Sequence, residues 1–598
     1  MISRYMKLRL RRHLRSRKKT IEKASEQAGE QFDDHVLGRW RNLRKVRRFV
    51  AGWLALVALL VLGVYVQGRE LDQYYLTEVS VPGGTFREGV VGEISNMNPI
   101  FATSAADRAA MRLQFNALFA YSQDNQLIGD LAKSFSLGDD GTIYTVELRE
   151  DVYWHDGEQF NADDVLFTYE SIQHPDTRSY LNVAWRDVIV QKKSDFVVTF
   201  ALPNPFTPFP HSLAEGGIIP EHILGDLDPA QIRGHKFNTT SPIGTGPFKL
   251  NELLVETKDA DANGQLRLIA NDGYYRGEVD LDKFVLTTFS DREVMVERFV
   301  EGELAAIGGL VTTDRSSITG SLDTTWHDLP LNNIVFVFFK TSDELLKDRD
   351  VRLALSKIVD KAPIHKVVEN RFPVVNSPIL PNQLGHDKNI VQVAQDREDA
   401  AKLLDKSGWK FKPGDEDDGF RYKKDEKLEV ELITQNSDDF PGVASEIAQQ
   451  WESLGVDVDV IAVNETDIQQ NNIATHNYQS LLFGISFGAD PDPFVYWHSS
   501  QGGVNGFNLS EVESDVIDEA LSSGRTRKDS NLRVAKYKTF LEEWRKLAPA
   551  YALYRPSYGY AQSNSVTGFT PSDINTPEQR FADVHRWRVN SGQGTRPY

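Results

Sequence analysis

Residues 148–165 read LREDVYWHDGEQFNADDV, and this stretch predicts a strand, a tight turn and the start of a helix. The β-rich run at 142–148 (TIYTVEL) supplies the strand. Asp156-Gly157 is a dipeptide typical of turns. Asn161 suits the cap of a helix, because its side chain can accept a hydrogen bond from the first turn, and the two acidic residues after Ala162 suit the positive end of the helix dipole.

A strand, helix and second strand are predicted further along the chain. Residues 428–432 (LEVEL) and 456–460 (VDVDV) alternate apolar and acidic side chains, as half-buried strands do. The segment between them carries apolar side chains at helical spacing, at Val443, Ile447, Trp451 and Leu454. This βαβ unit should have a right-handed crossover. A late amphipathic helix is predicted from Leu532 to Trp544, before Pro549, so the fold class is α/β or mixed α+β.

The length and the missing cysteines set limits on the whole protein. The chain has 598 residues and no cysteine. It is long enough for several domains or lobes, so disulfides are not needed for stability. The composition excludes a disulfide framework, cysteine-ligated metals, Fe–S clusters, a cysteine nucleophile and lipid attachment through cysteine. No repeat or long linker divides the chain.

The net charge of −19 hides a strong asymmetry. Residues 1–48 carry 16 basic and 5 acidic side chains, a net charge of +11, which leaves −30 for residues 49–598. The large acidic part is a poor candidate for nucleic-acid binding, so we expect no nucleic-acid partner. The short basic part suits contact with anionic lipid headgroups.

An uncharged run, Phe49–Val66, separates the two parts. Its 18 residues make a helix of about 27 Å, close to the roughly 30 Å of a bilayer core. Basic residues precede it, so the positive-inside rule puts residues 1–48 in the cytoplasm as a tail. A cleaved signal peptide is the alternative, but the basic segment is long and VYVQGREL holds no A-x-A site. We expect a single-pass protein of the cell membrane, with residues 67–80 as a tether and the rest extracellular or periplasmic.

Patterns that would indicate catalysis or a cofactor are weak. Residues 244–248 (GTGPF) lack the Gly-Lys-Ser/Thr of a phosphate loop and predict a tight turn. Residues 259–264 resemble half a calcium loop, but Ala270 stands where a bidentate glutamate is needed, and Asn263-Gly264 favours a hairpin turn. The acidic run 415–419 is more simply a solvated loop than a cation site. We expect no cofactor, no metal and no enzymatic activity.

One acidic loop stands out. Asp490-Pro491-Asp492-Pro493-Phe494 follows an apolar run at 481–486, LLFGIS. It therefore lies at the exit of a predicted strand, where α/β proteins place ligand contacts. A turn stiffened by proline, with solvated acids, is the alternative.

Taken together, these motifs resemble the extracellular solute-binding proteins of family 5, which serve oligopeptide, dipeptide and nickel ABC importers. The segment 148–165 is similar to the family signature, and the resemblance runs from about residue 85 to the C-terminus. Further similar segments are Asn96-Met97-Asn98-Pro99, 220–223 (PEHI), 242–248 (PIGTGPF), 271–277 (NDGYYRG), 350–361 and 488–493 (GADPDP). Lys340 departs from the pattern, since asparagine is common there.

The resemblance implies a type II periplasmic-binding-protein fold of two lobes. It predicts lobe I at 81–113, 237–332 and 555–598, an inserted domain at 114–236, and lobe II at 333–554. Ligand would be held between lobes that close by a hinge motion.

The implied function is capture of a peptide, or a peptide-like solute, and its delivery to the permease subunits of an ABC importer. In relatives, an aspartate in the loop that matches Asp490 pairs with the ammonium group of the peptide. A sensor or pheromone receptor that does not transport, and a wall-associated hydrolase, remain as alternatives. We expect a monomer whose ligand-binding residues are Asp490, Asp492, Asn96, Met97, Tyr554 and Trp497.

Overall fold

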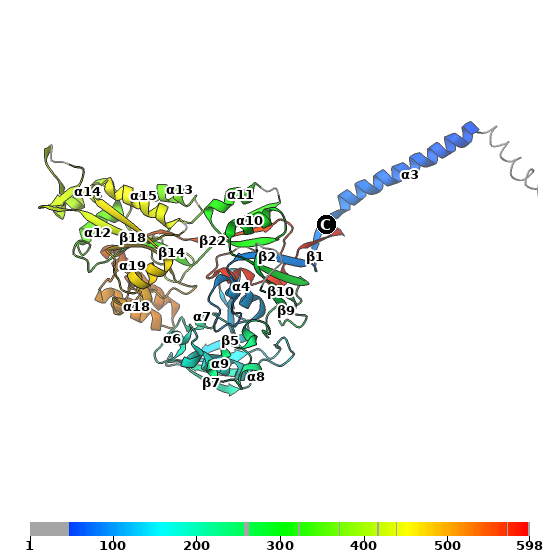
Figure 1. The fold of residues 1–598 in the computed structure, drawn as a ribbon, viewed down its shortest axis with the longest axis horizontal. Helices are drawn as coiled ribbons and strands as arrows, with labels where there is room; N and C mark the ends of the chain where they lie inside the picture. The colour runs from blue at the N-terminus through cyan, green and yellow to red at the C-terminus, as the bar shows by residue number, and fades with distance from the viewer. Residues whose placement is uncertain are drawn as a thin grey trace, which may run out of the picture. The chain divides into compact units, whose positions relative to one another are not determined.

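The computed structural model describes residues 47–255, 262–320, 323–369, 371–414, 418–437, 439–570 and 572–595. The chain forms two compact units, Met1–Val79 with Ser591–Tyr598, and Ser80–Asn590. The first unit holds the helix α3 (Arg47–Tyr75), drawn in blue in Figure 1. The 21 residues Arg47–Gln67 have a mean hydropathy of 2.5, and none of that apolar span is buried. The predicted span 49–66 is therefore helical, and the helix continues to Tyr75. Strands β1 (Leu76–Val81) and β23 (Asn590–Thr595) form a two-stranded sheet.

A seven-stranded sheet is the largest in the second unit. Its strand order is β13 (Thr324–Pro330), β22 (Ser557–Ser563), β12 (Ala306–Leu310), β2 (Thr85–Val91), β11 (Lys283–Phe289), β10 (Ala262–Ala270) and β9 (Phe248–Leu254). Strand β2 is parallel to both of its neighbours, and the other pairs are antiparallel. Helix α4 (Ala105–Gln114) packs on one face, while α10 (Arg292–Val300) and α11 (Arg315–Thr319) pack on the other (Figure 1).

A five-stranded mixed sheet with helices on both faces is the second large sheet of this unit. Its order is β19 (Asp457–Val463), β18 (Glu429–Gln435), β20 (Ser480–Ser486), β14 (Asn333–Phe339) and β21 (Ala550–Tyr554). One face packs on α12 (Arg349–Lys357), α13 (Lys361–Val367), α14 (Arg397–Lys406) and α15 (Phe440–Glu452). The other packs on α18 (Asp515–Thr526) and α19 (Ser530–Leu547) (Figure 1). Because helices cover both faces, β14 is almost wholly apolar (NIVFVFF).

The predicted βαβ unit is present. Strands β18 and β19 pair in parallel, with Val430 opposite Val458, and α15 connects them. The apolar stripe Val443, Ile447 and Trp451 is buried against the sheet, as the helical spacing predicts. The predicted late helix is α19, which ends two residues before Pro549.

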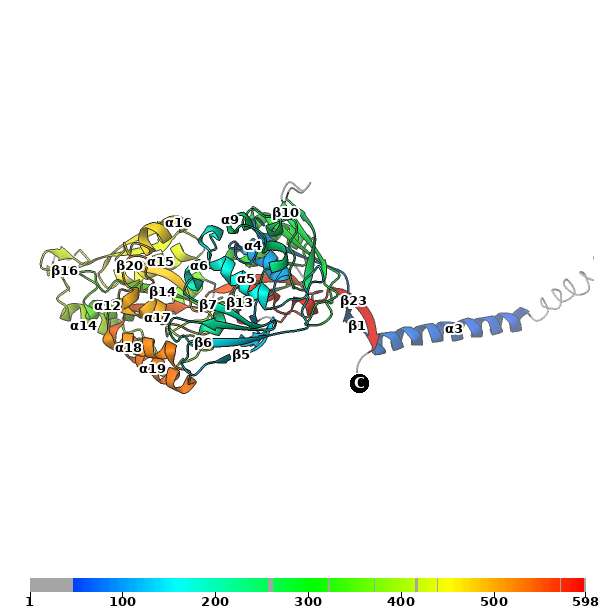
Figure 2. The ribbon, with the colours of Figure 1, turned by 90° about the horizontal axis from the view of Figure 1, so that it is seen from below.

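A four-stranded antiparallel sheet lies between β4 and β9 in the sequence. Its order is β5 (Ala132–Leu137), β6 (Ile143–Leu148), β8 (Val197–Ala201) and β7 (Ile189–Ser194); β5 and β6 are labelled in Figure 2. Helix α5 (Ala162–Gln173) packs beside it. Asn161 caps α5 by accepting from the Asp163 amide at 2.7 Å, while Asp164 accepts from the Asn161 amide at 3.0 Å. This reciprocal capping confirms the helix start predicted from the sequence.

A short hairpin, β3 (Phe119–Tyr121) and β4 (Leu127–Gly129), precedes this sheet. Strands β15 (Lys410–Phe411), β16 (Arg421–Lys423) and β17 (Glu426–Lys427) form a small sheet.

The seven-stranded sheet takes its strands from 85–91, 248–330 and 557–563, the five-stranded sheet from 333–554, and the four-stranded sheet from 132–201. The chain passes from the seven-stranded to the five-stranded sheet between β13 and β14, and returns between β21 and β22. Arg555 binds these two crossings together, donating to the Leu331 carbonyl at 2.6 Å and to Asn332 Oδ1 at 2.7 Å. The division into lobes and a hinge stays an interpretation of this arrangement.

The glycine-rich segment 244–248 is a packing turn. The Gly246 amide donates to the Gln114 carbonyl at 2.8 Å. A Cβ atom on Gly244 would lie 1.8 Å from that carbonyl oxygen, so the turn needs glycine for close approach. His155 fastens the same turn: its Nδ1 accepts from the Gly244 amide at 3.2 Å, and its Nε2 lies 3.0 Å from the Gly246 carbonyl oxygen.

The prediction of a hairpin turn at Asn263-Gly264 is wrong. Both residues belong to β10, where Gly264 pairs with Thr288 across the sheet and the register shifts between Ala262 and Gly264. Most of the connection from β9 to β10, residues 256–261, lies outside the described residues, and with it the first half of the candidate calcium loop at 259–264. Residues 415–417 of the acidic run also lie outside them.

Candidate functional site

A cavity of about 390 Å³ is lined by residues of helix α4, the hairpin strand β3, the end of β20 and the loops at 214–216 and 575–579. Helix α4 contributes Arg108 and Arg112 to its wall, and the hairpin strand β3 contributes Tyr121. Residues 486–488 close it at the exit of β20. The remaining lining residues are Met111, Ala120, Tyr180, Ala214, Glu215, Gly216, Asn575, Thr576, Glu578 and Gln579.

The charged side chains on the cavity wall differ in whether another residue pairs with them. Arg112 lies 3.8 Å from Asp130, a carboxylate that also accepts from Asn116 and Tyr275. Within the described parts of the chain, no hydrogen bond or ion pair engages the side chains of Arg108, Glu215 or Glu578. These groups are therefore available to a solute.

The surroundings of Glu215 oppose its ionisation. Loss of solvation within the surrounding protein is the main cause of its raised pKa; Arg108 acts against this effect and Glu578 adds to it. Its side chain remains accessible from the cavity, as a contact residue must be. A cation placed beside Glu215 would stabilise the ionised carboxylate and so offset the cost of its desolvation.

Aromatic side chains connect the cavity wall to the acidic loop after β20. The Tyr121 hydroxyl lies 3.1 Å from His211 Nδ1, and His211 Nε2 lies 3.9 Å from Asp490 Oδ2. Burial raises the pKa of Tyr121 and lowers that of His211, with Asp490 acting against the latter shift. The His211 ring therefore lies between Asp490 and Tyr121, which lines the cavity.

Both carboxylates of the acidic loop are paired with arginines. Arg533 donates to Asp490 at 2.7 and 2.8 Å, and Arg525 donates to Asp492 Oδ2 at 2.5 Å. Among the described atoms, Asp492 Oδ1 is buried without a hydrogen-bond partner. Burial raises the pKa of Asp492, and Arg525 opposes that shift. Neither carboxylate lines the cavity.

The other predicted ligand-binding residues lie apart from the cavity. Met97 is fully buried, and its sulfur accepts from Gln114 at 3.2 Å. Asn96 uses its Oδ1 to accept from the Asn98 amide at 3.0 Å. Trp497 is fully buried, and Tyr554 is buried and stacks on Phe372 with ring centres 5.3 Å apart. The structure does not bring the six nominated residues together, and their role in binding stays a prediction.

Sequence reasoning missed the cavity residues Arg108, Glu215 and Glu578. Glu215 carried one local signal, since an acid before Gly216-Gly217 in an apolar segment indicates a constrained loop. Gly216 has a φ of 72°, and a Cβ on Gly217 would lie 3.1 Å from Pro99. No local pattern marks Arg108 or Glu578.

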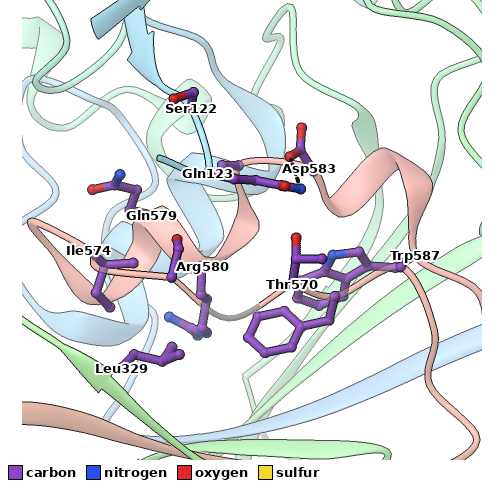
Figure 3. Close-up of a pocket in the computed structure, with 13 residues that line it drawn as sticks. Ser122, Gln123, Leu329, Thr570, Ile574, Gln579, Arg580, Asp583 and Trp587 are labelled. Carbon is purple, nitrogen blue, oxygen red and sulfur yellow. Dashed lines mark hydrogen bonds between the residues drawn. The ribbon is translucent and has the colours of Figure 1, made fainter. Parts of the chain in front are cut away.

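A second, smaller cavity lies between residues 122–123 and 568–587 (Figure 3). Gln123 donates to Asp583 at 3.0 Å across its edge. Its volume of about 20 Å³ is room for a single water molecule, which excludes a peptide or a sugar. The described residues also hold no group of three or more histidine, aspartate or glutamate side chains suited to a metal ion.

The family model of the bacterial extracellular solute-binding proteins, family 5 (middle), matches residues 126–506. The chain belongs to this family. The oligopeptide-binding protein AppA of Bacillus subtilis is 25% identical over 513 residues, which cover 84% of this chain and 91% of AppA. Di/tripeptide-binding protein 2 of Pseudomonas aeruginosa is 27% identical over 489 residues, covering 77% and 87%.

Solved structures of solute-binding proteins match as well. AppA from Bacillus subtilis in complex with a nonapeptide superposes with a TM-score of 0.67 at 24% identity, over 86% of this chain and 100% of AppA. NikZ from Campylobacter jejuni in complex with Ni(L-His) gives a TM-score of 0.68 at 25% identity, over 84% and 99%. The predicted periplasmic-binding-protein fold is confirmed.

Proposed function

We propose that this solute-binding protein captures a peptide, or a peptide-like solute, in the 390 Å³ cavity and delivers it to an ABC importer. It carries out no covalent chemistry. The protein acts as a monomer tethered to the cell membrane, with its N-terminus in the cytoplasm and the body outside. The family membership and the names of the peptide-binding relatives support this function.

The cavity with its uncommitted charges is the observation that carries the proposal. Its volume lies within the roughly 300–1,000 Å³ typical of sites for small ligands. Arg108 offers a cation and Glu215 offers a carboxylate, neither engaged by a described side chain. A free peptide carries one carboxylate and one ammonium group, and each charge needs a partner when it leaves water.

The tether is supported by the composition of α3. The apolar span Arg47–Gln67 has 21 residues, about 31 Å of helix at 1.5 Å per residue. This matches the roughly 30 Å hydrocarbon core of a bilayer. The basic segment before it favours a cytoplasmic N-terminus, because positive residues flank spans on that side.

Asp490 is proposed as a second contributor to ligand binding. It lies behind His211 and Tyr121, so a ligand that displaces or reorients these rings can reach its carboxylate. Its pairing with Arg533 means that any ligand ammonium would share the carboxylate with this arginine. Asp492, Asn96, Met97, Trp497 and Tyr554 are kept as weaker candidates for the same role.

The proposal is tested with the full-length protein purified in detergent. Native mass spectrometry should find a co-purified peptide, or retention of members of an equimolar library of dipeptides to nonapeptides. Retention of a sugar or a metal chelate in place of peptides would contradict the peptide assignment. Hydrolysis of the library would instead favour the enzyme alternative.

A further inference from the structure

The open charges in the cavity do not balance. Glu215 and Glu578 each present a carboxylate, while Arg108 is the one lining arginine that no described acidic side chain engages by an ion pair. Arg112 also lines the cavity, but it lies beside Asp130. The lining therefore has two carboxylates and one free cation.

The acidic loop behind the wall does not change this count. Asp490 is neutralised by Arg533 and Asp492 by Arg525, so each pair has no net charge. The Glu215 carboxylate is close enough to Glu578 to be affected by it, with Arg108 as the opposing influence. When Glu215 is ionised, one negative charge in the cavity therefore has no counterion among the described residues.

Both carboxylates stand on rigid supports. The loop of Glu215 is fixed by the Ile218 amide, which donates to the Asn116 carbonyl at 3.0 Å. Glu578 lies on the turn Pro577–Phe581, which Arg580 anchors through a buried ion pair with Glu88, at 2.5 Å. Asn575 at the start of this segment bonds to Gln579 and Asn125. Because the backbone at both positions is fixed in advance, these segments add little ordering cost when a ligand binds.

From this charge count we infer that the cavity selects solutes with a net positive charge, and that its preferred peptides carry a lysine or arginine side chain. The inference rests on the proposed function, since it names the class of peptide captured at the same site. The terminal carboxylate and ammonium of such a peptide match Arg108 and one glutamate, and the basic side chain matches the second glutamate. Tyr121 and Tyr180 on the wall add aromatic rings suited to a cation.

The experiment measures affinities by calorimetry on the full-length protein in detergent. The probes are alanine-based tripeptides, tetrapeptides and nonapeptides in three matched series. Each carries lysine, norleucine or glutamate at one position, which is moved along the peptide. Norleucine keeps the alkyl chain of lysine without its charge. For at least one length and position, lysine should bind at least tenfold more tightly than norleucine, a difference of about 1.4 kcal/mol, and glutamate should bind most weakly, because norleucine leaves a desolvated carboxylate without its partner and glutamate adds a like charge.

Two variants locate the preference. Glu215→Gln and Glu578→Gln should each reduce the ratio of lysine to norleucine affinities toward one. Glu301→Gln is the matched control, because Glu301 is an exposed glutamate outside the cavity lining. It should leave the ratio unchanged.

The outcomes separate the two proposals. Equal binding of the lysine and norleucine series, or a lysine preference that survives both cavity variants, would overturn the inference while leaving peptide capture intact. Binding of none of the three series would overturn peptide capture, and the inference with it.

Discussion

Arg533 on α19 and Asp490, in the loop after β20, form a bidentate ion pair with nitrogen–oxygen distances of 2.7 and 2.8 Å. Arg533 is 4% exposed, and its Nη2 also donates to the Tyr537 hydroxyl at 3.1 Å. The Tyr537 hydroxyl in turn donates to the Pro491 carbonyl, so the pair fixes the loop onto the helix. This pair therefore joins the stability of the fold to the position of a proposed ligand contact.

Asp490→Ala should lower the free energy of unfolding by about 3 kcal/mol, because it leaves Arg533 buried without a counterion. It should also weaken the binding of a confirmed peptide at least roughly 30-fold, about 2 kcal/mol. Chemical denaturation and calorimetry measure the two effects. The double variant Asp490→Leu with Arg533→Met should recover stability without recovering affinity.

Glu519→Ala serves as the control, since Glu519 belongs to an exposed ion pair with Lys536 and should leave the unfolding midpoint unchanged. N-acetylation of the peptide should weaken binding to the unaltered protein and add little in the Asp490→Ala variant. Neutral effects of both changes on affinity would contradict a role for Asp490 as an ammonium ligand.

His155 should make the fold sensitive to acid. Burial lowers the pKa of His155 to about 4, below the ordinary 6.5. Between these values the unfolded chain takes up a proton that the folded chain does not, so the stability from neutral His155 is present above pH 6.5 and lost as pH falls toward 4. Protonation would also place a hydrogen on Nδ1, which accepts from the Gly244 amide.

The measurement is the thermal unfolding midpoint at pH 7.0 and 4.5. His155→Gln should be less stable than the unaltered protein at pH 7.0 and lose less stability on acidification. His174→Gln, at an exposed histidine, should behave like the unaltered protein. An equal acid-induced loss in the unaltered protein and the His155→Gln variant would exclude this histidine as the cause.

Gly244→Ala should destabilise the fold by several kcal/mol, on the order of a severe overpacking substitution. The new Cβ would lie 1.8 Å from the Gln114 carbonyl oxygen, which is backbone and cannot swing away. Denaturant titration measures the effect. Gly234→Ala is the control, because its nearest neighbour would be 3.9 Å away. Similar midpoints for the two variants would show that the turn relaxes easily.

Protease added to intact cells should degrade the chain beyond about residue 70 and spare the basic N-terminal tail. The physical reason is the uncharged span after a segment of net charge +11. Antibodies against each end report the result. Recovery of a soluble mature protein that begins after residue 66 would show cleavage instead of anchoring.

Peptide binding should make the protein more compact, because the part with the five-stranded sheet should close on the part with the four-stranded sheet. Thr207 already contacts the Arg525 and Arg527 carbonyls, at 2.9 and 3.0 Å, and Lys528 donates to the Asp139 carbonyl at 2.9 Å. Small-angle scattering should show a smaller radius of gyration with saturating peptide. Lys528→Ala should raise the radius in the absence of peptide. Identical profiles at verified saturation would argue against hinge closure.

Local signals in the sequence predicted local structure well. The Asn161 cap and the apolar stripe of α15 depend on residues a few positions apart, so a short window contains the whole cause. The hairpin turn predicted at Asn263-Gly264 does not form, because pairing with β11, more than 20 residues away, outweighs the turn preference of the dipeptide.

The candidate site was harder to predict, since its charges come from distant segments. Arg108 lies on α4, Glu215 in a loop and Glu578 on the turn Pro577–Phe581, and these distant segments line one cavity only in the folded chain. The aspartate that the sequence singled out lies near this cavity, but no pattern within 488–493 reveals that Arg533, from another helix, neutralises it. Pairing across the fold is invisible to a local motif.

The order of strands in the seven-stranded sheet has a consequence for how the protein is made. Strands β12 and β13 both pair with β22, which begins about 250 residues after β12 ends. At 5–20 residues per second, a growing chain leaves those edges unpaired for roughly 10–50 s. Unpaired edges are templates for aggregation. Shielding these two edges until β22 emerges should therefore reduce aggregation of the nascent chain.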